Sequence, residues 1–292
     1  MNIQTRPDPV ARARELGTEI AAAADEIERT RRIPEALLER FHDSRLFRML
    51  LPRSAGGDET EPAVYVAAIE ELARHDASIA WNAFVANSSS LIAAYLDPGV
   101  NRAIFADPRS IVAWGPPNAS RARAVDAGYR LTGKWDFASG CRHARWLGAH
   151  CHVLEADGTL RLNRLGQPTV RTLLFPASDA TLLDTWQTIG LRGTASDSYC
   201  VNDVFVSEAF SSTREDRRCA SSAARSMLSP CSVSTRPGSP VWRSASRARC
   251  CPSSSRWRRA RRRAAWPGLP TTRSCKPTWR ARRRGSARHM PI

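Results

Sequence analysis

The sequence predicts an α+β protein in which a helical N-terminal domain, residues 1–108, precedes a domain of β-strands, residues 109–216. Two observations carry this prediction. Apolar residues recur at helical spacing before Arg109, and they alternate with polar residues after it. The acidic residues also stop abruptly, because all 28 Asp and Glu lie at or before Asp216. Residues 217–292 are therefore a third part, a basic tail that we expect to be disordered.

Four helices are expected in the first domain. The spacing of Leu16, Ile20 and Ile27 predicts an amphipathic first helix. The fourth is apolar nearly all round, which predicts that it is buried. Proline and an Asp-Pro-Gly sequence mark the starts and ends. The expected ranges are Pro9–Arg31, Pro34–His42, Glu61–Arg74 and Ala77–Leu96, with a loop over Pro52–Gly57.

Trp81 and Asn82 lie in the fourth expected helix, followed by the polar run Ser88–Ser90. These side chains are candidates for lining a substrate cavity. Core packing is the alternative account, and it is favoured for residues on a buried helix.

The second domain is expected to contain β-strands separated by Gly, Pro and Asp-Gly turns. Glu155–Gly158 reads as a hairpin turn. The expected strands are Ser110–Trp114, Ala124–Gly140, Leu147–Leu154, Val170–Pro176, Asp179–Trp186 and Tyr199–Phe205.

Two segments of this domain carry candidate binding residues. In Gly128–Gly140, strand alternation places Trp135 and Phe137 on one face, and Ser139-Gly140 ends the strand. Two aromatic rings, a hydroxyl and a flexible glycine suit a planar ring laid against a strand end. A strand with two core aromatics and a turn is the alternative, and it is favoured when the segment is considered alone.

In the second segment, Asp184–Phe205, a Gly-x-Arg-Gly turn at Gly190–Gly193 precedes hydroxyl side chains that include Thr194. Such a turn presents backbone N–H groups beside the guanidinium of Arg192, which suits a phosphate or an electron-rich ring edge. A β-turn with a surface arginine explains the same residues.

Together the two segments resemble the middle domain of the acyl-CoA dehydrogenase superfamily, and most closely its flavin-dependent monooxygenase branch. Ile33–Glu35, Leu46–Gly57 and Glu70–Trp81 fit the family's N-terminal patterns, although Arg45 stands where the family has a glycine. The dehydrogenases' Trp-Ile-Thr-Asn ending is absent after Trp135. The resemblance covers about residues 10–210, and its strand motif includes Gly133, Trp135, Phe137, Ser139, Gly140, His143, Ala144 and Trp146.

The resemblance implies a β-barrel middle domain and an oxygenase component that uses reduced flavin, FMN or FAD, supplied by a separate reductase. It would hydroxylate a small molecule through a flavin hydroperoxide, as a homotetramer. By the match, Ser139 is catalytic near the flavin N5 edge, although structural packing is an alternative role for His143. Dehydrogenation of an acyl-CoA with FAD is the alternative function. The implied cofactor contacts are Trp135, Phe137, Ser139, Gly140, His143, Arg192 and Thr194.

The tail holds 20 of the 44 Lys and Arg and no acidic residue, so it carries +20 and the first 216 residues carry −4. One interpretation is a nucleic-acid arm, since arginine binds phosphate and tryptophan stacks on bases. The favoured hypothesis is a frameshift near Asp216–Cys219. Read one base back, the tail can encode an Ala- and Leu-rich segment like the family's C-terminal four-helix domain, so this form is expected to be defective.

The first ten residues lack the apolar segment of a signal peptide, and no apolar run reaches the roughly 18 residues of a membrane span. We therefore expect a cytoplasmic protein without a membrane partner. Cys141, Cys151 and Cys200 have no metal-ligand spacing, so we expect reduced thiols and no metal.

Overall fold

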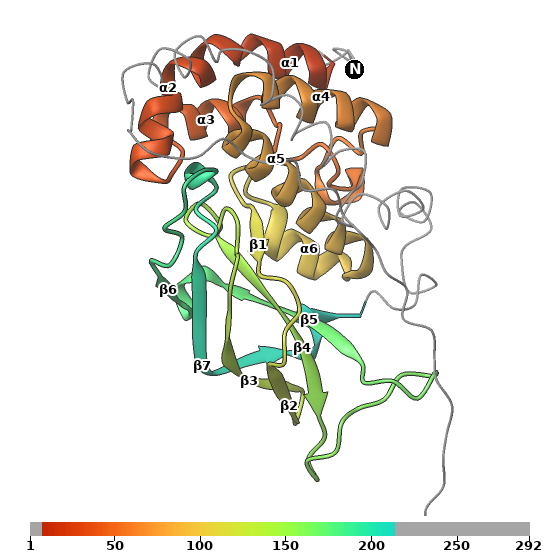
Figure 1. The fold of residues 1–292 in the computed structure, drawn as a ribbon. Helices are drawn as coiled ribbons and strands as arrows, with labels where there is room; N and C mark the ends of the chain where they lie inside the picture. The colour runs from red at the N-terminus through yellow and green to blue at the C-terminus, as the bar shows by residue number, and fades with distance from the viewer. Residues whose placement is uncertain (1–7, 214–292) are drawn as a thin grey trace, which may run out of the picture. The chain divides into compact units, whose positions relative to one another are not determined.

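The computed structural model describes residues 8–213, in which helices come first and strands follow (Figure 1). This confirms the predicted order of helices and strands. The basic tail and the frameshift hypothesis concern residues outside this range. The helices are α1 (Pro9–Glu15), α2 (Gly17–Thr30), α3 (Glu35–Asp43), α4 (Pro62–His75), α5 (Ala77–Ser90) and α6 (Pro98–Phe105).

The first expected helix is two helices, because the chain is interrupted at Leu16 between α1 and α2. Gly17 begins α2 where the chain passes against α4. A Cβ at Gly17 would lie 2.5 Å from Nε2 of His75, so a larger residue there would have to displace the His75 ring. Periodicity alone did not reveal this break, since apolar residues keep the same spacing on both sides.

Helix α5 is buried over most of its length, as predicted. Its N-terminus is capped by Asp76, whose Oδ1 accepts the N–H of Ile79 at 2.8 Å. After Ser90 the helix tightens into a 3₁₀ turn, Leu91–Tyr95. The sequence analysis missed α6, because Pro98 reads as an exit signal but occupies the first turn of a new helix, a position that proline favours.

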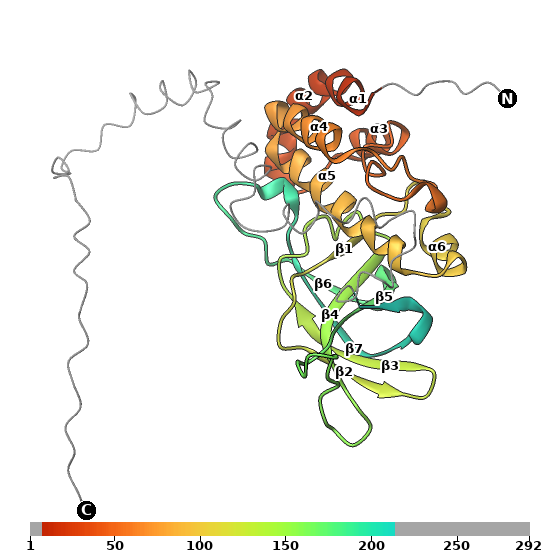
Figure 2. The same cartoon turned by 90° about the vertical axis from the view of Figure 1, so that its right-hand side faces the viewer.

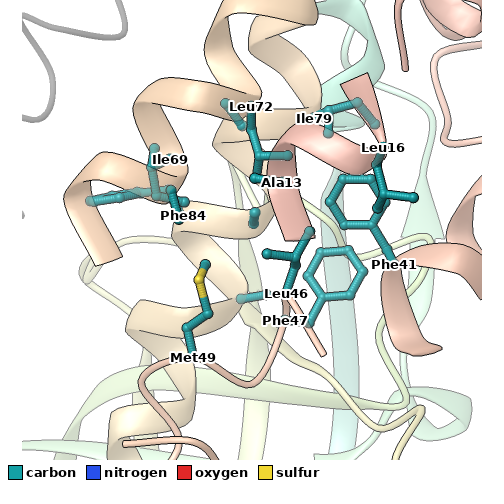
Figure 3. Packing of buried hydrophobic residues seen from close by; sticks show 14 of the residues in the cluster. Ala13, Leu16, Phe41, Leu46, Phe47, Met49, Ile69, Leu72, Ile79 and Phe84 are labelled. Atoms are coloured by element: carbon teal, nitrogen blue, oxygen red, sulfur yellow. The ribbon is translucent and has the colours of Figure 1, made fainter. Parts of the chain in front are cut away.

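The core of the helical part gathers side chains from α1 to α5 and from the segment after α3, and Figure 3 shows some of them. Phe41 and Phe47 form its aromatic centre, with ring centroids 5.3 Å apart. Ile79 and Phe84 of α5 belong to the same cluster. Helix α5 also contacts β1, so this core fixes α5 against the β part (Figure 2).

The strands form one mixed sheet with the order β6-β7-β3-β2-β4-β5-β8, and β1 pairs with β4. The pairs β1–β4 and β2–β4 are parallel, and the other pairs are antiparallel. The strands are β1 (Val112–Trp114), β2 (Arg121–Val125), β3 (Gly128–Trp135), β4 (Trp146–Leu154), β5 (Val170–Pro176), β6 (Thr181–Leu183), β7 (Ser198–Ser207) and β8 (Ser211–Ser212).

The sheet curls around its own core, as the expected barrel implies. Tyr199 on β7 donates its hydroxyl to the carbonyl of Gly148 on β4 at 2.6 Å, and its ring contacts Phe175 of β5. Within residues 8–213, however, the ladder of paired strands runs from β6 to β8 without closing. All described residues fall within one compact unit, so the boundary between residues 108 and 109 stays a prediction.

Two expected strands differ in extent. The range Ala124–Gly140 folds into the β2–β3 hairpin, whose turn includes Ala127 at φ +56°, and β3 ends at Trp135. Strand β6 covers only three residues of the expected Asp179–Trp186. The hairpin turn at Glu155–Gly158 is present, with the N–H of Gly158 donating to the carbonyl of Glu155.

Candidate functional site

The two segments singled out in the sequence lie side by side. The N–H of Ala138 donates to the carbonyl of Asp197 at 2.9 Å, and the N–H of Gly140 donates to that of Thr194 at 3.0 Å. Because both bonds join backbone to backbone, they set the register between the end of the first segment and the turn of the second. The structure therefore brings Ser139 and Thr194 into one site.

Trp135 and Phe137 do not share a face, which corrects the prediction from strand alternation. The strand ends at Trp135, and Phe137 has φ +61°, so the pleat on which the prediction depended stops between them. Trp135 is fully buried, and its Nε1 donates to the carbonyl of His150 at 3.0 Å. Phe137 is 62% exposed.

Phe137 packs against the loop after β6, and we call the apolar side chains of this contact and loop the Phe137–Trp186–Ile189 surface. The ring of Phe137 packs edge-on against Trp186, with centroids 6.2 Å apart. The Nε1 of Trp186 donates to the carbonyl of Leu191 at 2.8 Å, which fixes the indole on this loop. Ile189 is fully exposed. This surface offers flat apolar area beside Ser139.

Four hydrogen-bonded side chains form the hydroxyl chain, Trp81–Ser139–Ser196–Thr194. The indole Nε1 of Trp81 donates to Ser139 Oγ at 2.9 Å. Ser139 Oγ lies 2.7 Å from Ser196 Oγ, which lies 2.7 Å from Thr194 Oγ1. Thr194 Oγ1 donates to the carbonyl of Leu191 at 2.9 Å. The three hydroxyl-bearing residues are buried, so their hydrogen bonds are shielded from water.

Asp197 holds the loop of the second segment in place. Its carboxylate is 1% exposed and accepts hydrogen bonds from the backbone N–H groups of Thr185 at 3.0 Å and Trp186 at 2.9 Å. It also accepts one from Arg142 Nε at 2.6 Å. Asp197, Ser196 and Arg142 were not predicted as site residues, although Asp197 and Ser196 lie within the second segment and Arg142 lies two residues after the first.

Arg142 and Arg31 both bind Asp184 at the start of the same loop. Arg142 Nη2 lies 2.9 Å from Asp184 Oδ1, and Arg31 at the end of α2 forms a second ion pair with that carboxylate. The hydrogen bond from Arg31 holds the pKa of Asp184 below its usual value. The loop is therefore tied to the helical part.

Arg192 points to the helical part rather than standing free beside the glycine turn. Its Nε donates to the carbonyl of Glu28 at 2.9 Å, and its Nη1 to that of Thr188 at 3.2 Å. These donors are engaged with the backbone, which corrects the expectation of a guanidinium presented beside free N–H groups. Gly193, the next residue, packs against Ser78 of α5 and Ile27 of α2.

His143 also joins the helical and β parts. Its Nε2 accepts the N–H of Ile33 at 3.2 Å, which places the ring proton on Nδ1. Burial lowers the pKa of His143 to about 4, so the ring is neutral at physiological pH. It lines a cavity of about 420 Å³ beside His42 and Arg145, and Ser139 is not among the residues of that cavity.

Asn82 lies close to Gly140 and donates through Nδ2 to the carbonyl of Gly193 at 3.0 Å. Its buried Oδ1 has no hydrogen-bond partner among the described residues. A Cβ at Gly140 would lie 3.3 Å from that oxygen. Asn82, Ser139 and Gly140 line a cavity of about 10 Å³, which has room for about one water molecule.

Residues 8–213 contain no group of three or more His, Cys, Asp or Glu placed to hold a metal ion. Their cysteines are free, and burial raises the pKa of Cys141 and Cys151 to about 12. None of the helices in this range is long and apolar enough to span a bilayer.

Comparison with known families defines the class of this fold. Residues 11–99 match the acyl-CoA dehydrogenase N-terminal domain. With the β-sheet domain that follows, this match places the described part of the chain in the acyl-CoA dehydrogenase superfamily, as the sequence motifs predicted.

Within that superfamily the chain is similar to oxygenase components of flavin-dependent monooxygenases. It is 32% identical over 206 residues to the FADH2-dependent resorcinol hydroxylase oxygenase component of Rhizobium sp., covering 70% of this chain and 49% of the relative. It is 29% identical over 190 residues to the oxygenase subunit HsaA of Mycobacterium tuberculosis, covering 64% and 46%.

A solved structure, XiaF from Streptomyces sp. in complex with FADH2 and glycerol, matches with a TM-score of 0.65 and 30% identity. The match covers 73% of this chain and 53% of XiaF. The chain thus spans about half the length of the relatives that it matches.

Proposed function

We propose that the described residues are the N-terminal and middle parts of the oxygenase component of a two-component, reduced-flavin monooxygenase. The relatives named above support this class. The observation that carries it is local: Ser139 of the first segment is joined through Ser196 to Thr194 of the second, beside exposed Phe137. The two motifs thus form one side of a single site.

The residues present fit a flavin. The Phe137–Trp186–Ile189 surface offers apolar area to a planar ring. Ser139 has one acceptor position left after its bonds to Trp81 and Ser196, which suits the polar edge of that ring. Gly140, at φ +78°, keeps the backbone next to Ser139 free of a side chain.

In this proposal Phe137 and Trp186 bind and orient the ring, Ser139 holds its polar edge, and Asp197 fixes the loop that carries Trp186. Gly140 belongs to the backbone support, and Trp135 supports the site from the core. Trp81 donates a hydrogen bond to Ser139, and Asn82 donates one to the carbonyl of Gly193. We propose these supporting roles for them in place of lining a substrate cavity. When bound, reduced flavin supplies the electrons with which O₂ is activated for hydroxylation.

Arg192 and His143 connect the helical part to the site, and we propose that they act by positioning. Thr194 supports Ser139 rather than touching the ring. We further propose a separate flavin reductase as partner, a small-molecule substrate, a homotetramer and a location in the cytoplasm. The relatives are named oxygenase components and subunits, which accords with a second protein that supplies reduced flavin.

Acyl-CoA dehydrogenation shares the N-terminal domain family but is less supported, since the relatives above are named hydroxylases and monooxygenases. A nucleic-acid function would rest on the tail alone, outside the described residues. The two enzyme functions differ in products: the first incorporates an oxygen atom from O₂, and the second forms a double bond in an acyl-CoA.

The test uses the gene with its frame restored one base back after Asp216. The protein is supplied with chemically reduced FMN or FAD and ¹⁸O₂, with resorcinol, named in the first of the relatives above, as a probe substrate. We expect ¹⁸O in the product without NADH. Dehydrogenation of acyl-CoA probes without oxygen incorporation would overturn the proposal in favour of the alternative.

A further inference from the structure

The direction of every hydrogen bond in the hydroxyl chain follows from its two ends. At one end, the indole N–H of Trp81 can only donate, so Ser139 Oγ accepts there. At the other end, the carbonyl of Leu191 can only accept, so the single proton of Thr194 Oγ1 is used in that bond. The hydroxyls between these ends must then be ordered in sequence.

Because the proton of Thr194 is used, Ser196 donates to Thr194 Oγ1 across 2.7 Å. Because the proton of Ser196 is used in turn, Ser139 donates to Ser196 Oγ across 2.7 Å. Ser139 is left with no free proton and with one free lone pair. A ligand that reaches Ser139 therefore meets a hydrogen-bond acceptor.

We propose that Ser196 and Thr194 are positioning residues that fix the Ser139 hydroxyl as an acceptor, and that this polarity selects reduced over oxidised flavin. The inference rests on the proposed function, in which Ser139 holds the polar edge of the flavin. Reduced flavin carries a hydrogen on N5, and this N–H can donate a hydrogen bond to Ser139 Oγ. Oxidised flavin has a bare N5 lone pair, which would face the lone pair of Ser139.

Changing Thr194 should invert the selection. In Thr194→Val the acceptor of Ser196 is lost, so Ser196 can donate to Ser139 instead. Ser139 then accepts from both Trp81 and Ser196, and its own proton becomes free for a ligand. Thr194→Ser keeps the hydroxyl and should retain the original polarity. A purely structural role for Thr194 predicts no inversion.

The experiment uses the protein with its frame restored after Asp216, and it measures the dissociation constants for reduced and oxidised FMN, anaerobically, by fluorescence. The wild type is expected to prefer reduced FMN by roughly tenfold, because a mismatched buried acceptor loses a hydrogen bond. Thr194→Val is expected to remove or reverse this preference, and Thr194→Ser to retain it. The matched control is Ser198→Ala, which removes a buried hydroxyl bonded to Thr185 and Asp136, outside the chain.

A second readout needs no flavin. In protein labelled with ¹⁵N-tryptophan, the indole N–H of Trp81, assigned with Trp81→Phe, should shift upfield in Ser139→Ala and stay in place in Ser198→Ala. An unchanged Trp81 signal in Ser139→Ala would overturn the hydroxyl chain itself. Equal affinity for the two flavin forms would overturn only the selection, whereas no binding of either form would contradict the proposed function as well.

Discussion

Asp197 and Arg142 form an ion pair in which the guanidinium Nε of the partly buried arginine donates to the buried carboxylate at 2.6 Å. The pair joins the residues just after the first candidate segment to the second segment. The same carboxylate orders the loop that carries Trp186 through two backbone N–H groups. The geometry of the proposed site thus depends on one acidic side chain that is itself buried.

Replacing Asp197 with Asn is expected to destabilise the protein by about 3 kcal/mol, because it removes a buried carboxylate that accepts hydrogen bonds from Arg142 and from two backbone N–H groups. Chemical denaturation would measure the loss. Amide hydrogen exchange at Thr185 and Trp186 should also become faster. The control is Asp203→Asn, an exposed acid paired with Arg130, with an expected change below about 0.5 kcal/mol. Equal effects would refute a central role for Asp197.

Gly140→Ala is expected to cost more stability than Gly158→Ala. Both glycines have positive φ, +78° and +84°, so both substitutions strain the backbone by about 1 kcal/mol. Only at Gly140 does the new Cβ meet a neighbour, Asn82 Oδ1 at 3.3 Å, whereas Gly158 has open space. Thermal unfolding of the two variants gives the comparison. An equal loss of stability would show that the Asn82 side chain moves away from the new Cβ at no cost.

His143 makes stability depend on pH. Burial puts its folded-state pKa at about 4, below the 6.5 of an unperturbed histidine. The unfolded chain therefore takes up a proton first, and stability is lost as pH falls from about 6.5 towards 4. Above 6.5 both states are neutral and the contribution is constant.

His143→Gln keeps an acceptor for the N–H of Ile33 but cannot titrate. Its loss of stability between pH 7 and 5 should be smaller than that of the wild type by about 1–2 kcal/mol. Urea denaturation at the two pH values measures the difference. His152→Gln, on β4, serves as the control. If the free energy of unfolding changes between pH 7 and pH 5 by the same amount in His143→Gln and in the wild type, then His143 is not the group responsible.

Strong local patterns predicted much of the fold. The ranges of α3 and β5 follow from periodicity and turn residues, and the buried α5 follows from its apolar composition. The sequence could not show that the pleat stops at Trp135, because alternation assumes a continuous strand and Phe137 takes a positive φ.

Long-range polar contacts were equally hidden. Trp81 and Ser139 are 58 residues apart in the chain, and their hydrogen bond depends on how α5 packs on the sheet. The sequence motif identified Ser139 and Thr194 but not the hydroxyl of Ser196 that joins them. The buried carboxylate of Asp197 was likewise hidden, since nothing local distinguishes it from a surface acid.

Phe137 offers the sharpest test of the proposed flavin surface, because its ring is exposed and contributes little to the core. Phe137→Ala should leave stability nearly unchanged and weaken reduced-flavin binding by about tenfold, since it removes apolar contact area. Phe205→Ala is the matched control, because Phe205 is also an exposed phenylalanine and lies on β7 under Arg130.

The central claim is that the Phe137–Trp186–Ile189 surface and Ser139 bind reduced flavin. An anaerobic titration of the protein with its frame restored after Asp216, using reduced FMN and FAD and followed by tryptophan fluorescence, tests it most directly. The account predicts saturable quenching that is weakened in Phe137→Ala, is unchanged in Phe205→Ala and loses its main component in Trp186→Phe. Absence of saturable quenching, or equal binding by all variants, would contradict it.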